Sequence, residues 1–136
     1  MDTLKYFTTL VVAMLLCLIT MVACAYLWVY LYSIFIHTTG DAAHYEAYAQ
    51  VASPVVAVVT APFVFYVMGR FMRRYGDGAL KAALTVVALN LVLDVMAVMS
   101  VADDLTYHIS MSALSLLGKL AGSYLGSRSA GQTSTV

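Results

Sequence analysis

Gly69-Arg70-Phe71-Met72-Arg73-Arg74-Tyr75-Gly76-Asp77-Gly78 is the stretch that decides the fold, and Lys81 follows it closely. It holds the densest cationic cluster in the 136-residue chain and lies between two long apolar segments. Short loops rich in lysine and arginine stay in the cytoplasm and so set the orientation of a membrane protein. We therefore interpret Arg70, Arg73, Arg74 and Lys81 as topology residues that also meet anionic lipid head groups.

The composition excludes an ordinary soluble domain and a nucleic-acid partner. Hydrophobic residues make up 62% of the chain and charged residues only 10%, with a mean hydropathy of +0.88. A nucleic-acid-binding protein needs a basic face, whereas the formal net charge here is zero. Cys17 and Cys24 lie seven apart inside an apolar run, which favours small buried residues over a redox pair.

Four apolar segments predict an all-α, polytopic membrane protein built as an up-down four-helix transmembrane bundle. The expected spans cover residues 6–36, 51–69, 79–101 and 107–126. Each is long enough to cross a hydrocarbon core of about 30 Å. Residues 1–126 then form a single domain, with sequential helices as antiparallel neighbours, and residues 127–136 form a polar, disordered tail.

The first two segments each carry a complication. Met21-Val22-Ala23-Cys24 loosely resembles a lipoprotein cleavage box, but the apolar run continues to Ile36, which favours an intact helix. Pro54 and Pro62 fall within the second segment. Proline removes a backbone donor, so the interior proline predicts a kink, as a packing feature or as a hinge.

The charges divide between the two ends of the predicted bundle. The cations lean toward one side, namely Lys5, Arg70, Arg73, Arg74, Lys81, Lys119 and Arg128. Lys119 lies within the fourth segment, and we expect its long stem to snorkel to that same interface. The other side holds Asp41, Glu46, Asp103 and Asp104 together with His37, His44 and His108. By the positive-inside rule, both termini are cytoplasmic and the protein is integral to the plasma (inner) membrane.

Asn90 and Asp94 form a predicted intramembrane polar site, one helical turn apart on the third segment. An acid at that depth is costly unless it is paired, faces water or takes up a proton, so function is the default hypothesis. The structural alternative is an Asp94 that bonds Asn90 or serines of the fourth segment and holds helices together.

A second group of candidates lies on the predicted outer face. His37, His44, Glu46, Asp103, Asp104 and His108 are possible metal ligands, with Met96, Met99 and Met111 on the same side. Their spacing matches no established metal site, and an acidic outer surface also follows from the positive-inside rule alone. A haem held between His37 and His108 is a further alternative. No cofactor is firmly implied.

Gly118, Gly122 and Gly126 recur at every fourth position of the fourth segment. This spacing puts three glycines on one helix face, where a neighbouring backbone can approach closely. The neighbour is a helix of the same bundle or of a second copy. The expected partners are the lipid bilayer and, in addition, a homo-oligomer or another membrane protein.

Three functions remain open from the sequence. No catalytic motif is present, which favours a non-enzymatic accessory, assembly or interaction protein. An alternative is a small oligomeric transporter or channel for ions or protons that uses Asn90 and Asp94. The second alternative is a metal- or haem-binding protein of the outer face.

Overall fold

The computed structural model describes residues 2–100 and 104–128, and every regular element in these residues is helical. They form α1 (Thr3–Phe35), α2 (Ala42–Met72), the short 3₁₀ helix η1 (Arg73–Gly78), α3 (Ala79–Met99) and α4 (Leu105–Arg128). The all-helical prediction is confirmed. Ser127 and Arg128, expected in the tail, belong to α4, while residues 129–136 lie outside the described part.

Acidic N-caps define where the first two helices begin. Asp2 accepts a hydrogen bond from the Leu4 amide, and Asp41 Oδ1 accepts one from the His44 amide at 2.9 Å. Such bonds satisfy backbone donors that have no partner in the first turn. α2 therefore starts at Ala42, and the polar residues 42–50 are continuous with the apolar helix that follows them.

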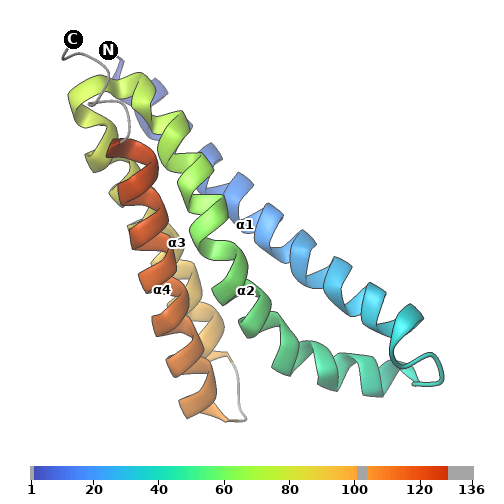
Figure 1. Cartoon of the computed structure of the whole chain (residues 1–136). Helices are drawn as coiled ribbons and strands as arrows, with labels where there is room; N and C mark the ends of the chain where they lie inside the picture. Colours follow the sequence, from blue (N-terminus) through green and yellow to red (C-terminus); the bar gives the residue numbers. More distant parts are fainter. Residues whose placement is uncertain (1, 101–103, 129–136) are drawn as a thin grey trace.

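Two helical stretches are long and apolar enough to cross a membrane, judged by length and composition. They are Thr3–Phe35 and Ala42–Met99, and the second runs through α2, η1 and α3 in succession. Gly76 interrupts that second stretch because its φ of +57° lies in the left-handed region that favours glycine. The chain reverses direction there, so that α3 returns beside α2 and α4 (Figure 1).

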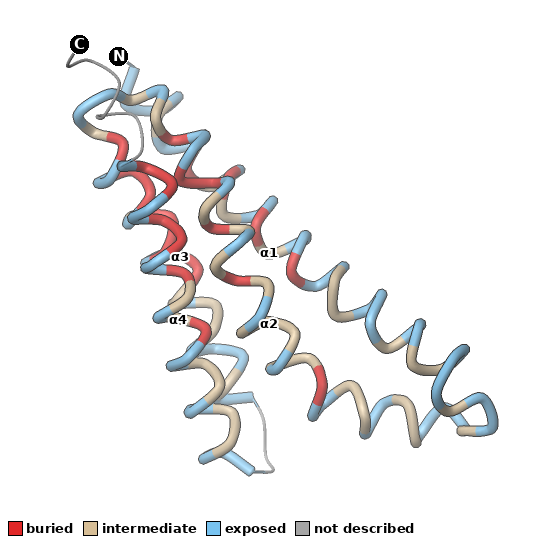
Figure 2. Tube along the Cα trace, viewed as in Figure 1, coloured by how far each residue is buried: buried red, intermediate tan, exposed pale blue. Residues whose placement is uncertain are grey.

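The helices meet at one end of the molecule and separate toward the other. Figure 1 shows the start of α1, η1 and the end of α4 together, whereas the α1–α2 turn lies well away from the start of α4. Buried positions concentrate toward the joined end, which Figure 2 shows in red. The buried apolar cluster comprises Leu10, Ala13, Cys17, Met21, Ala61, Phe65, Met68, Met72, Ala82, Ala83, Val86 and Val87.

α2 packs most extensively on α4 rather than on its neighbours in sequence. A Cβ atom added to Gly118 would lie 3.0 Å from Pro62 Cδ, and one added to Gly126 would lie 3.1 Å from the Arg70 nitrogen. The two residues of each pair are 56 apart in the sequence. The same offset separates Tyr107 from Val51, whose carbonyl accepts a hydrogen bond from the Tyr107 hydroxyl at 2.7 Å. A constant offset means that α2 and α4 run parallel and in register along this contact.

The glycine face of α4 is thus occupied within the chain. A Cβ on Gly122 would lie 2.3 Å from the Pro62 carbonyl oxygen, and one on Gly69 would lie 2.7 Å from the Ser123 carbonyl oxygen. Small residues on both helices let the two backbones approach closely. Arg73 reinforces the joined end, because its Nε donates to the Gly126 carbonyl at 2.8 Å.

Both prolines of α2 lie within the continuous helix. Each lacks an N–H, so the carbonyls of Gln50 and Val58, four residues earlier, receive no helical hydrogen bond from them. α2 changes direction in its first half (Figure 1), which is the half that contains Pro54. This bend carries the start of α2 away from α4 and contributes to the separation of the helices.

Candidate functional site: a cavity that ends at a buried ion pair

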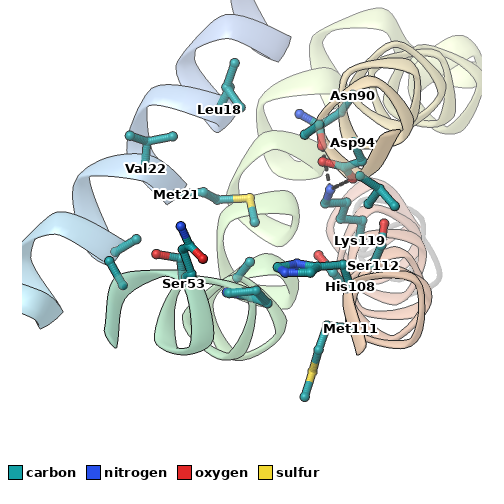
Figure 3. A pocket seen from close by; sticks show the side chains of 18 of the residues that line it. Leu18, Met21, Val22, Ser53, Asn90, Asp94, His108, Met111, Ser112 and Lys119 are labelled. Atoms are coloured by element: carbon teal, nitrogen blue, oxygen red, sulfur yellow. Dashed lines mark hydrogen bonds and ion pairs between the residues drawn. The ribbon is translucent and has the colours of Figure 1, made fainter. Parts of the chain in front are cut away.

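A cavity of about 500 Å³ lies between the diverging helices, and all four α-helices contribute to its wall. α1 and part of α2 supply mainly apolar side chains, including Met21 and Val22. The polar groups come from α2, α3 and α4, and Figure 3 shows them on facing walls. A mostly apolar wall with a few convergent polar groups is typical of small-molecule sites.

Lys119 of α4 forms the centre of the inner end of the cavity. Its ammonium donates to Asn90 Oδ1 at 2.6 Å and forms an ion pair with Asp94 (Figure 3). Lys119 and Asn90 are each only 1% exposed, whereas the side chain of Asp94 is 24% exposed. The ion pair is therefore sealed on the lysine side and accessible on the carboxylate side.

The sequence around Lys119 explains why the lysine stays inside the fold. Gly118 presses against Pro62, and Gly122 presses against the backbone of α2 one turn later. These contacts fix the rotation of α4, and Lys119 then meets α3 at Asn90 and Asp94. The Lys119 ammonium also lies 5.7 Å from the centroid of the Phe65 ring, within range of a cation–π attraction.

The electrostatics of this inner end favour a compensated pair. A charge removed from water is stabilised in a protein only when a partner charge and further hydrogen bonds replace the lost hydration. Asp94 supplies the charge and Asn90 supplies the extra acceptor. Among the described residues, the buried Asn90 Nδ2 is one of the few side-chain atoms without a hydrogen-bond partner.

The outer part of the cavity is lined by Glu46, Gln50 and Ser53 from α2 and by His108 and Ser112 from α4. In Figure 3, His108 and Ser112 lie on the α4 wall, and Ser53 lies across from them. Three kinds of group thus follow one another along the wall. Glu46 is an exposed acid, the middle groups are neutral amides and hydroxyls, and the buried ion pair comes last.

Comparisons with protein-family models, with curated proteins and with solved structures find no match for this chain.

Asn90 and Asp94, the predicted polar site, form a single site with Lys119. The expectation that Lys119 extends to the interface is wrong, because its ammonium turns to Asp94 and Asn90. Asp94 therefore has the basic partner that its sequence neighbourhood lacks. A usable signal was present: an acid and a base, each isolated in an apolar segment, cost least when they pair with one another.

The possible metal ligands are spread over separate places. The His37 and His44 rings stack with centroids 4.2 Å apart at the α1–α2 turn, beside Tyr32 and Tyr45. Glu46 and His108 line the cavity, Asp104 precedes α4, and Asp103 lies outside the described residues. Within residues 2–100 and 104–128, no three histidine, cysteine or acidic side chains gather as a metal site.

The haem alternative finds no support in this arrangement. His37 belongs to the α1–α2 turn, and His108 lies in the first turns of α4, at the other tip of the separated end (Figure 1). Tyr45 donates to the His37 carbonyl at 2.5 Å, and the Tyr32 hydroxyl lies 3.3 Å from His44 Nε2. These contacts tie the two histidines of the turn into an aromatic cluster that closes it.

Proposed function

We propose that the protein is a small four-span transporter of the plasma membrane that carries protons or small cations through its cavity. The observation that supports this most is the Asp94–Lys119 pair at the inner end of a cavity that reaches the carboxylate. Ionisable residues inside membrane bundles pair with one another and mark the pathways of ions and protons. In this proposal, α1 to α4 span the bilayer as an up-down bundle.

The distribution of charge supports an orientation for these spans. Arg70, Arg73, Arg74 and Lys81 lie in or beside η1, at the joined end, which we place in the cytoplasm with both termini. Glu46 and His108 lie on the wall of the cavity toward the separated end. The cavity would then open to the outside, with acidic and neutral polar groups lining the way to Asp94.

The chemistry of the pair suggests how a cation would be taken up. A proton or small cation that reaches Asp94 competes with Lys119 for the carboxylate. Lys119 keeps a second acceptor in Asn90 Oδ1, so its ammonium does not lose every partner when the carboxylate is engaged. The bound cation and the lysine would thus alternate on one carboxylate, which is an exchange that a carrier requires.

Proton flux into liposomes tests this proposal directly. We expect purified protein, reconstituted with a pH-sensitive dye inside the vesicles and driven by a potassium diffusion potential, to acidify the lumen faster than protein-free vesicles. Asp94→Asn should return the rate to that of protein-free vesicles, because the amide cannot carry a proton. Sodium uptake in the same vesicles, and potassium uptake in vesicles without the diffusion potential, cover the small cations.

Asp77→Asn is the matched control, since Asp77 is an exposed acid in η1 outside the cavity. It should transport like the unmodified protein. Equal flux of protons, sodium and potassium in the unmodified protein and in Asp94→Asn would refute the transport proposal.

A second candidate, an accessory or assembly protein, is supported by the outer half of α1. Beyond Met21, α1 continues to Phe35 without another buried residue. Three large apolar side chains are exposed there, namely Leu27, Leu31 and Ile34. A helix of another membrane protein would be able to pack against them. In a bilayer, lipid would cover them equally well.

Isolation in a mild detergent separates the two candidates. An accessory protein should co-purify with one defined membrane protein at a fixed ratio, and Leu27→Gln with Leu31→Gln should release that partner. Retention of the partner by the double variant would count against this use of α1. A uniform preparation without a partner that nevertheless transports protons favours the transporter.

A further inference from the structure

A second hollow lies on the outside of the α1–α2 pair, near the joined end. It has a volume of about 700 Å³ and an almost wholly apolar wall. α1 contributes seven residues to it, from Thr8 to Thr20, and α2 contributes Phe63, Val64, Val67, Met68 and Phe71. Arg74 of η1 completes the lining.

The groove has a charged end and an apolar end. α1 and α2 run antiparallel, and Tyr6 contacts Tyr75 with ring centroids 5.0 Å apart, so Thr8 lies toward Arg74 and Thr20 toward Phe63. The Arg74 guanidinium lies 4.5 Å from the Phe71 ring centroid. Within the described part of the chain, no carboxylate forms an ion pair with Arg74, so this cation remains available to a ligand.

The threonines of the wall add no free polar group. Thr8, Thr9 and Thr20 each donate their hydroxyl to a carbonyl one turn earlier on α1, at 2.8 Å. From Thr8 to Thr20 the groove is about 18 Å long, at about 1.5 Å per helical residue. One leaflet of the hydrocarbon core is about 15 Å deep, so the groove matches the depth of a single leaflet.

We propose that this groove binds one anionic phospholipid of the cytoplasmic leaflet, with an acyl chain along α1 and α2 and the phosphate on Arg74. An apolar groove as long as one leaflet is deep fits an acyl chain of the lipid. A guanidinium at its interfacial end fits a phosphate, because its planar donors match phosphate oxygens. The assignment rests on the membrane location proposed above and is independent of transport through the cavity.

Native mass spectrometry of the purified protein in detergent, with phosphatidylglycerol or phosphatidylcholine of identical chains, tests the site. We expect one retained phosphatidylglycerol and about tenfold weaker retention of phosphatidylcholine. Both lipids carry the phosphate, but the choline ammonium cancels the net negative charge of phosphatidylcholine and repels Arg74. Arg74→Gln should abolish the preference and Arg74→Lys should keep part of it. Arg70→Gln is the matched control, because Arg70 is exposed and lies outside the groove.

A second pair of variants tests the apolar part of the groove. Val67→Trp should fill the groove and reduce retention of both lipids. The Val67 side chain is 66% exposed, so the fold can accommodate the larger ring. Val92→Trp, at a 58% exposed position on α3, should leave retention unchanged. Glycerol phosphate, a head group without chains, should not compete at the concentration of the lipid.

Several results would overturn the proposal. They are equal retention of the two lipids, equal losses in Arg70→Gln and Arg74→Gln, unchanged retention in Val67→Trp, or full competition by glycerol phosphate. Asp94→Asn should retain phosphatidylglycerol normally, so failure of the transport proposal is distinguishable from failure of this one.

Discussion

Gly122→Ala should destabilise the protein by about 3 kcal/mol, at the upper end of the usual cost of overpacking. The added Cβ would lie 2.3 Å from the Pro62 carbonyl oxygen and 3.0 Å from the Tyr66 nitrogen. Both obstacles are backbone atoms, so no side-chain rotation relieves the clash and the two helices must separate. Unfolding in mixed micelles, followed by circular dichroism as the fraction of dodecyl sulfate increases, measures the loss.

Gly78→Ala provides the control for this substitution. The nearest atom to an added Cβ there is Tyr75 Cβ at 3.9 Å, an ordinary contact. Its φ of −84° also suits alanine, so the stability should change little. If Gly122→Ala unfolded at the same dodecyl sulfate fraction as Gly78→Ala, the close parallel contact between α2 and α4 would be disproved.

Lys119→Met should destabilise the fold by about 3–5 kcal/mol, the usual cost of removing one partner of a buried ion pair. Methionine nearly matches the length of the lysine stem but leaves the Asp94 carboxylate and Asn90 Oδ1 without their donor. The same micelle titration measures the loss. Under the transport proposal, proton flux should also stop in liposomes, because Lys119 is the cation proposed to exchange on the carboxylate.

The double variant Lys119→Met with Asp94→Leu separates charge from packing. It removes both charges, so it should be more stable than Lys119→Met alone, while the flux remains absent. Lys81→Met, which removes an exposed lysine of α3, should change stability by less than about 0.5 kcal/mol. A double variant less stable than Lys119→Met would show that the two side chains do not act as a pair.

The all-helical fold follows from the pattern of apolar residues, but the helix limits follow only in part, because α2 begins at Ala42, nine residues before the expected span 51–69. Gly76 and Asp77 mark the reversal before α3, whereas the role of Asp41 as the N-cap of α2 is seen only in the structure. These signals are local, since each depends on a few adjacent residues and on backbone geometry. The continuation of α2 through Pro54 is less evident, because proline in isolation argues for an end or a kink.

Helix pairing could not be obtained in the same way. The expected neighbours in sequence, α2 and α3, contact each other less than α2 and α4 do. The glycine repeat of α4 indicated a close contact but not its partner, because Pro62 and Gly69 complete the matching surface from a distant part of the chain. The Lys119–Asp94 pair depends on that same rotation of α4, and it therefore appears only once the pairing is known.

The parallel contact of α2 with α4 also determines the order of assembly. Tyr66 and Gly122 are 56 residues apart, so at about 5–20 residues per second the ribosome adds the second roughly 3–11 s after the first. During that interval, the surface of α2 around Pro62 and Gly69 lacks α4, so the packing of the first three helices cannot be completed. A chain interrupted before α4 would leave uncovered the surface of α2 around Pro62 and Gly69 that α4 covers in the complete fold.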